Sequence, residues 1–239
     1  MHYQWNWMIF WDEAPEGSLT FFDTLVSGLC YTLMTAALAW IIALLIGIVI
    51  GALRITPNKT VARLTDFYIG LFRHVPLLIQ LFLWYSVIPK LLPADWTDWI
   101  GKLQSAPMIT GILCMAFFTS ARVAMLVSHG LQNQSKDQAV PYEPGEHSLT
   151  PGSSLILLPP TLRLTMPAFA NEAATAIKNS SVALTIGILE LTASARSLAD
   201  FSFLTLEAII AATLIYIGVS AIEIATECMT CVDVSRFYR

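Results

Sequence analysis

The sequence predicts an all-α integral membrane protein with five transmembrane helices. Hydrophobic residues make up 56% of its 239 residues, charged residues make up only 13%, and the apolar residues are gathered in long runs. Such a run of roughly 20 residues is what an α-helix needs to cross a bilayer. This composition fits neither a soluble nor a disordered chain. We therefore expect a transmembrane domain at 24–227, between an external segment at 1–23 and a cytoplasmic tail at 228–239.

Runs with few charges place the five spans. No charged residue occurs from Thr24 to Leu53, which predicts the first span. The spans are expected at 24–53, 68–92, 103–127, 162–191 and 204–225. The fourth has the weakest hydropathy because Glu172 and Lys178 interrupt it. The first residues lack the basic and apolar regions of a cleavable signal peptide, so the first span is expected to direct insertion.

Lysine and arginine indicate the orientation of the spans. The loop after the first span contains Arg54, Lys59 and Arg63, and the chain ends with Arg236 and Arg239. Loops rich in these residues remain in the cytoplasm, which predicts the N-terminus outside and the C-terminus inside. Tryptophans near the outer span ends are then expected to anchor the chain in lipid as an interfacial aromatic belt: Trp5, Trp7, Trp11, Trp96 and Trp99.

A polar segment stands at the start of the second span. Arg73 and His74 precede Pro76, and proline fits the first turn of a helix because its missing N–H is not needed there. Gln80 lies seven residues beyond Arg73, so the two are expected to share one helix face. Both are candidates for the substrate pathway. The alternative is an entry cap with a helix–helix hydrogen bond from Gln80.

A second polar segment lies inside the fourth span. Charged side chains are costly in a bilayer, so Glu172 and Lys178 are expected to face a bundle interior or an aqueous cavity. Their six-residue spacing does not bring them together, so each is expected to have a partner elsewhere. The alternative is that Lys178 only extends toward the interface. The pathway candidates here are Asn171, Glu172, Lys178, Asn179, Ser180 and Ser181.

Three stretches together resemble the polar-amino-acid permeases of binding-protein-dependent ABC importers. They are FRHVPLLIQLF with WY and Pro89, FTSAR at 118–122, and IKNSSVALTIGILEL at 177–191. The opening WNWMIF is most similar to the glutamate/aspartate permeases. The resemblance covers about 5–216 and implies a type I ABC-importer permease core in a bacterial inner membrane, with an acidic amino acid as the favoured substrate. It also implies a cytosolic ATPase dimer, a second homologous permease and an external solute-binding protein.

The expected ATPase-coupling loop at 132–160 departs from this family. Its members carry Glu-Ala-Ala, a glycine and Ile-x-Leu-Pro, in a short helix that docks on the ATPase. Only the end is present here, and prolines at 141, 144 and 151 disfavour a helix. We predict no helix of three turns at 140–152 and weak coupling, whether through compensated reading-frame shifts or true divergence. The coupling candidates are Lys136, Gln138, Gly145, Ile156, Leu158 and Pro159.

The chain is expected to be a transport subunit with no catalytic residue, metal, cofactor or nucleic-acid partner. It has no GxxxxGK[ST] loop, so ATP hydrolysis belongs to partner chains. The CxxC of Cys228 and Cys231 lacks the further ligands of a metal site. Arg73, Lys178 and Arg122 are the cations that would offset a substrate carboxylate, although the two arginines lie near the inner interface. The alternative is a permease-like protein, uncoupled from ATP, that acts as an inactive partner or scaffold.

Overall fold

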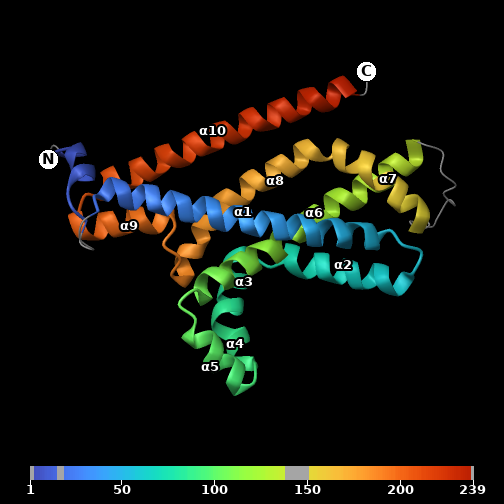
Figure 1. The fold of residues 1–239 in the computed structure, drawn as a ribbon, viewed down its shortest axis with the longest axis horizontal. Coiled ribbons are helices and arrows are strands. Elements are labelled where there is room, and N and C mark those ends of the chain that lie inside the picture. The colour runs from blue at the N-terminus through green and yellow to red at the C-terminus, as the bar shows by residue number, and fades with distance from the viewer. Residues whose placement is uncertain (1–2, 15–18, 138–150, 238–239) are drawn as a thin grey trace.

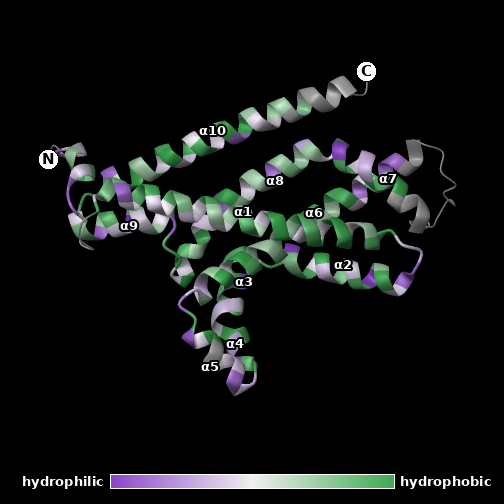
Figure 2. Ribbon diagram, viewed as in Figure 1, coloured by the Kyte–Doolittle hydropathy of each residue, from purple (hydrophilic) through white to green (hydrophobic). Residues whose placement is uncertain are grey.

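The structure is a bundle of α-helices (Figure 1). It is a computed structural model that describes residues 3–14, 19–137 and 151–237, and within these ranges the only strand-like pairing is a bridge between Glu13 and Thr20. Three helices have an apolar stretch long enough to cross a bilayer, and they are hydrophobic along most of their length (Figure 2). They are α1 (Phe21–Arg54), α6 (Ala106–Asp137) and α10 (Thr205–Phe237). The expected all-α membrane fold is confirmed, and the span count reaches five if each of two bent helix pairs is one span.

Helix α1 begins at a capping box. The Asp23 backbone N–H donates to Thr20 Oγ1 (3.2 Å), and the Thr20 N–H donates in return to Asp23 Oδ2 (3.0 Å). This reciprocal pair satisfies two N–H groups that a helix end leaves without partners. The helix then runs without a break to Arg54, since no proline or charged residue interrupts it.

Small residues on one face of α1 let α6 approach closely. A Cβ atom on Gly47 would lie 2.6 Å from Val123 Cβ and 2.8 Å from the Ser120 carbonyl oxygen, and one on Gly51 would lie 2.7 Å from the Ala124 oxygen. Gly47 lies against Ser120 and Val123, and Gly51, four residues later, lies against Ala124 and Val127. Helices α1 and α6 therefore run in the same direction. Such close approach of two helix backbones at glycines is typical of helix pairs in membranes, where close packing supplies much of the association energy.

Three hydrophobic clusters follow one another along α1. The cluster at its N-terminal end joins α1 to α9 (Leu191–Ser202) and α10. The middle cluster joins it to α3 (Leu77–Phe82) and α6 around the fully buried Leu81. The cluster at its C-terminal end is built on Ile55, Val127 and Phe169. The three clusters therefore fix α1 to its neighbouring helices along its whole length.

The expected second span at 68–92 is wrong as a continuous helix. Helix α2 begins earlier, at Lys59, and ends at His74; the chain then bends by 101° before the next segment. Pro76 explains the break, because it has no N–H and pushes Val75 into an extended conformation (φ −86°, ψ 127°). The second segment comprises α3 (Leu77–Phe82), the π-helical η2 (Leu83–Val87) and α4 (Ile88–Leu91).

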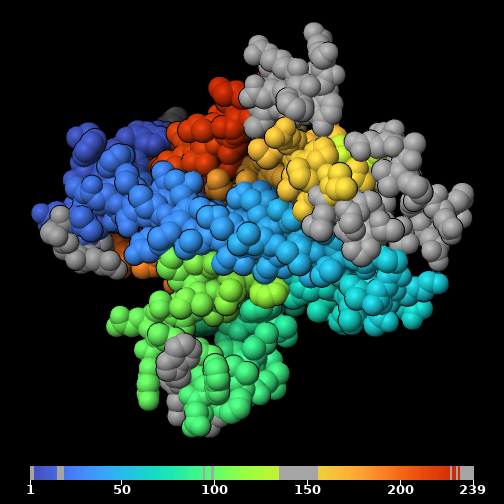
Figure 3. All heavy atoms as spheres, turned by 45° about the vertical axis from the view of Figure 1, so that its right-hand side comes forward, coloured from blue at the N-terminus to red at the C-terminus, as the bar shows by residue number. Residues whose placement is uncertain are grey.

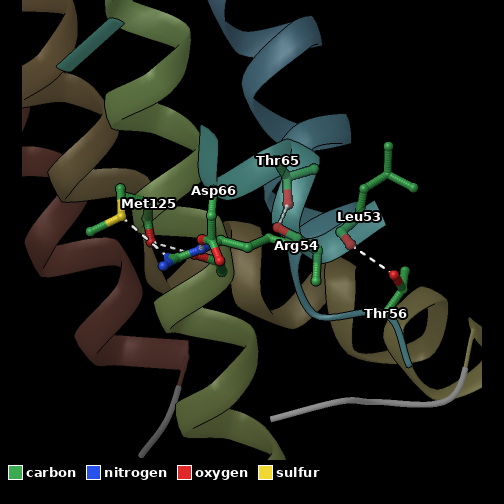
Figure 4. A network of polar contacts seen from close by, with 8 residues as sticks. Leu53, Arg54, Thr56, Thr65, Asp66 and Met125 are labelled. Atoms are coloured by element: carbon green, nitrogen blue, oxygen red, sulfur yellow. Dashed lines mark hydrogen bonds and ion pairs between the residues drawn. The ribbon is translucent and has the colours of Figure 1, made fainter. Parts of the chain in front are cut away.

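Arg54 ties the C-terminal end of α1 to its neighbours (Figure 4). Its Nε forms a 2.8 Å ion pair with Asp66 of α2, and its Nη1 donates to Ser128 Oγ (3.0 Å) and Met125 Sδ (3.2 Å) of α6. One guanidinium thus links three helices, which holds α2 against the bundle on its side of the bend.

Both ends of the expected coupling loop at 132–160 are helical. Helix α6 continues to Asp137, because no proline or glycine interrupts Leu131–Asp137, and α7 (Pro151–Leu164) starts with proline at its first position. Lys136 therefore lies in α6, and Ile156, Leu158 and Pro159 lie in α7. Gln138, Gly145 and most of the segment at 140–152 lie outside the described residues, so the prediction of no helix there stays a prediction.

The expected fourth span at 162–191 is also not a single helix. It divides into the end of α7, then α8 (Met166–Asn179) and the 3-10 helix η3 (Ser180–Ile186). Gly187 ends η3 in the left-handed region (φ 89°), where a residue with a side chain would be strained. Helix α9 follows at a bend of 49°. Two more short helices were not expected, η1 (Trp7–Trp11) and α5 (Ala94–Lys102), and the expected tail at 228–239 continues α10 as far as Phe237.

Candidate substrate pathway

A pocket of about 490 Å³ lies where α2, α6 and α8 meet. Helix α6 supplies five residues, at positions i, i+4, i+7, i+8 and i+11, which places them on one helix face. Arg73 enters from the last turn of α2 and Glu172 from α8. The α6 residues of the lining are Phe118, Arg122, Met125, Leu126 and His129.

An ion pair crosses this pocket from α6 to α8. Arg122 Nε lies 2.9 Å from Glu172 Oε2. The Glu172 side chain is 10% exposed and that of Arg122 is 37% exposed, so the carboxylate is enclosed while the guanidinium stays open to the pocket. Glu172 thus has its partner on another helix, as its spacing from Lys178 indicated. Because burying a lone carboxylate is costly, this pair fixes the position of Arg122.

Arg73 and Gln80 do not share a helix face, because the 101° bend separates them. Arg73 is exposed at the C-terminal end of α2, where the helix dipole favours a cation, and it lines the same pocket as Arg122. Gln80 is buried, and its Nε2 donates to the carbonyl oxygens of Phe72 (2.8 Å) and Val75 (2.9 Å). The bend leaves these carbonyls without helix partners, so Gln80 stabilises the break.

The polar residues of α8 and η3 divide between two surroundings. Lys178 and Ser181 line a groove of about 450 Å³ against α10, separate from the pocket of Arg122. Lys178 is exposed, and among the described residues its side chain has no ion-pair partner. Ser180 is fully buried and Ser181 half-buried, and their hydroxyls donate to the backbone carbonyls of Ile177 (2.7 Å) and Lys178 (2.8 Å). Asn171 is exposed and Asn179 half-buried.

Two titratable residues close to these candidates were not among the predicted site residues. His129 belongs to the pocket, and its seven-residue spacing from Arg122 was the signal that would have found it. Glu190 is fully buried and accepts from the N–H groups of Thr192 and Ala193 (2.9 Å each) and from the Tyr216 hydroxyl (3.0 Å). It caps α9 and joins that helix to α10, so its charge is satisfied by structure.

No metal centre occurs in the part of the chain that the structure describes. No group of three or more histidine, cysteine, aspartate or glutamate side chains lies close enough to hold an ion. Cys228 and Cys231 are both exposed on α10. The charged groups instead line a pocket and a groove between helices.

Membrane-length helices around a pocket and a groove that are lined by charged side chains are typical of a polytopic membrane permease. The family model of the binding-protein-dependent transport system inner membrane component matches residues 43–224, and the chain belongs to this family. It is the permease subunit of an amino-acid ABC importer, a multi-pass protein of the inner membrane, in a family that works with ATPase and binding-protein partners. Its relatives are transport subunits, and ATP hydrolysis takes place in other chains.

Individual relatives cover nearly the whole chain. The glutamate/aspartate import permease protein GltJ of Escherichia coli strain K12 is 36% identical over 225 residues, which are 92% of this chain and 91% of GltJ. The nopaline transport system permease protein NocM of Agrobacterium fabrum is 26% identical over 83% of each chain. A crystal structure of an amino acid ABC transporter with histidines has the same fold, with a TM-score of 0.66 at 21% identity over 91% of this chain and 94% of the other.

Proposed function

We propose that this subunit imports acidic amino acids, glutamate or aspartate. The observation that carries the proposal is the placing of Arg73 and Arg122 in one pocket, with Arg122 held by Glu172. An acidic amino acid has two carboxylates, and arginine binds a carboxylate through two parallel hydrogen bonds. The printed name of GltJ, a glutamate/aspartate permease at 36% identity, supports the same substrate class.

The charge of the pocket supports an anionic substrate. The two arginines and one glutamate of the lining together carry one net positive charge. An acidic amino acid carries one net negative charge and would neutralise this excess. A basic amino acid would meet like charge, which is unfavourable. The pocket therefore favours acidic over neutral and basic substrates.

The surfaces of the bundle suggest where the partners bind. We place the solute-binding protein on the external face of the bundle and the ATPase dimer inside, at the α6–α7 end. The second permease subunit is placed on the groove between α8 and α10. Only 11% of the apolar stretch of α10 is buried within the chain, compared with 28% for α1 and 50% for α6. Lys178 and the four hydroxyl groups of that groove also fit a protein or aqueous neighbour better than lipid.

The alternative of an uncoupled scaffold rests on the altered coupling loop alone. The family match continues across that loop from 43 to 224, and the end of the pattern, Ile156 to Pro159, is present in α7. The relatives align over most of their own length. These matches favour a working transport subunit, and solute-stimulated ATP hydrolysis by the assembled importer is the direct measurement.

The Arg73→Gln variant tests the substrate proposal. We expect uptake of glutamate relative to glutamine to fall roughly tenfold, because a hydrogen bond between charged groups contributes about 1.5 kcal/mol. The measurement is labelled-substrate uptake into vesicles that contain the permease with its ATPase and solute-binding protein. Arg63→Gln is the matched control, since Arg63 is exposed on the same helix and does not line the pocket.

Two results would contradict the proposal. An unchanged glutamate-to-glutamine ratio in Arg73→Gln would remove Arg73 from the pathway. Uptake of neutral or basic amino acids in preference to glutamate by the unmodified importer would refute the substrate class.

Reporter fusions test the proposed orientation. Fusions at Pro57 and Gln134 are expected to report a cytoplasmic position, because the short loop after α1 carries the lysine and arginine excess. A fusion at Asp95 is expected to report an external position. A cytoplasmic reading at Asp95 would reject the orientation with the N-terminus outside.

A further inference from the structure

The first described residues form an aromatic surface at the N-terminal end of α1. Trp5 and Trp7 stack with ring centres 5.6 Å apart and planes at 6°, and Tyr3 meets Trp5 edge-on at 5.0 Å. No lysine or arginine occurs in residues 3–14, whose only charges are Asp12 and Glu13. The exposed side chains of this surface are Tyr3, Trp5, Trp7, Met8 and Trp11.

A buried carboxylate locks this segment to α10. Glu207, in the first turn of α10, is fully buried and accepts from the Tyr3 hydroxyl and from the Asn6 backbone N–H (3.0 Å). Asn6 Oδ1 in turn accepts from the Met8 N–H (3.2 Å) and starts η1. The hydrogen bond to Glu207 also raises the pKa of Tyr3 above its ordinary value.

The other side of the segment is packed into the bundle. Ile9 and Ala14 are buried in the cluster that joins α1, α9 and α10. The Phe21 N–H donates to the Asp12 carbonyl (3.1 Å), which closes the turn back to α1. The N-terminal segment lies beside the starts of α1 and α10 in Figure 1, and its atoms cover that end of the bundle in Figure 3. The aromatic rings are therefore held in fixed positions.

The aromatic surface continues the exposed apolar side of α1. Trp11 stacks on Phe22 at 5.6 Å, and Phe22 begins the exposed apolar face of α1. That face is aliphatic over most of its length, with Ser27 and Tyr31 as polar members near its start. Its aliphatic members are Val26, Leu33, Leu38, Ile41, Leu45 and Val49. Indole and phenol rings favour the headgroup region, where an apolar ring meets a polar edge.

We propose that residues 3–11 form a preorganised membrane-interface foot that binds zwitterionic phospholipid headgroups and is locked to α10 by Glu207. Zwitterionic lipid fits better than anionic lipid because the segment has no cation, while Asp12 and Glu13 would repel negative headgroups. The cationic part of a zwitterionic headgroup can also lie against the tryptophan faces. Since the foot stays fixed to two spanning helices, it sets their depth in the bilayer.

Tryptophan quenching in the full chain, reconstituted in phosphatidylcholine nanodiscs, tests the foot. A Trp5→Phe, Trp7→Phe, Trp11→Phe variant supplies the baseline, so the difference from the unmodified chain belongs to these three rings. We expect the difference signal to be quenched by lipid brominated near the headgroup and protected from aqueous iodide. In discs of anionic phosphatidylglycerol the bromolipid quenching is expected to weaken.

Glu207→Ala tests whether the hydrogen bonds of Glu207 hold the foot against α10. This variant is expected to lose bromolipid quenching and gain iodide quenching, because the segment is released from α10. Asp200→Ala is the matched control, an exposed acid on α9 that contacts neither Tyr3 nor Asn6 and is expected to change nothing.

The unmodified chain keeps the proposal open to rejection even if Glu207→Ala does not fold. Iodide quenching of all three rings in nanodiscs would overturn the foot. So would rings that remain open to iodide in lipid and become protected only when a solute-binding protein is added, since the surface would then be a protein-docking site. Equal bromolipid quenching in both kinds of disc would overturn the preference for zwitterionic lipid.

Discussion

Replacing Gly47 with leucine is expected to prevent stable folding of this permease. Even the first added carbon would lie 2.6 Å from Val123 Cβ and 2.8 Å from the Ser120 carbonyl oxygen, and the backbone oxygen cannot move aside. Overpacking of a well-packed core costs about 1–3 kcal/mol, and a clash with backbone belongs at the upper end or beyond, at about 3 kcal/mol or more. Helices α1 and α6 would have to separate, and with them the framework that carries Arg122.

The thiol of Cys114 provides the measurement. Cys114 is fully buried in α6, whereas Cys30, Cys228 and Cys231 are exposed. Labelling of the Cys114 thiol as the temperature rises therefore reports unfolding of the bundle in detergent. Gly218→Leu is the matched control, because a Cβ on Gly218 meets nothing within 4 Å. Equal melting temperatures for Gly47→Leu and the unmodified chain would show that α1 and α6 do not pack as described.

The regular parts of this fold were the predictable parts. An uninterrupted apolar run has one stable form in a bilayer, a helix, so the sequence was enough to place α1. Its limits were also marked by local chemistry, Thr20 with Asp23 at one end and Arg54 at the other. Such signals act within one turn and need no knowledge of the neighbouring helices.

The bends were not predictable from hydropathy. Pro76 shows that a helix weakens there, but the 101° bend depends on how α3 packs on α6 and on Gln80, which bonds the carbonyls that the break leaves free. At the fourth span, hydropathy continues smoothly through Gly187, while the chain turns through a positive φ. A window average does not distinguish a straight helix from two short ones of the same composition.

The candidate site was predictable only in part. The cost of burying Glu172 required a partner on another element, and the sequence indicated that much. It gave no way to choose Arg122, which lies 50 residues away in the chain on another helix. The same limit applies to Tyr3 and Glu207, which are separated by 204 positions. Such pairs form only where the packing of the helices brings the two side chains together.

Breaking the Arg122–Glu172 pair is expected to have an asymmetric effect on stability. Arg122→Leu leaves a carboxylate in an enclosed position, which costs about 3 kcal/mol by comparison with other buried pairs. Glu172→Leu leaves a guanidinium that is 37% exposed and can be hydrated from the pocket, so its cost is expected to be smaller. Unfolding of the two single variants, followed through the Cys114 thiol, should therefore rank Arg122→Leu as the less stable.

The double variant separates the structural role of this pair from its role in transport. Replacing both residues with leucine removes both charges, and apolar replacements of a buried pair are often neutral, so stability is expected to return close to that of the unmodified chain. If Arg122 binds a substrate carboxylate, glutamate uptake by the assembled importer will stay lost even though the fold is restored. Recovery of both stability and glutamate uptake in the double variant would show that the pair only holds α6 to α8. Persistent instability would show that the contact between Arg122 and Glu172 is not the interaction that the two single variants disturb.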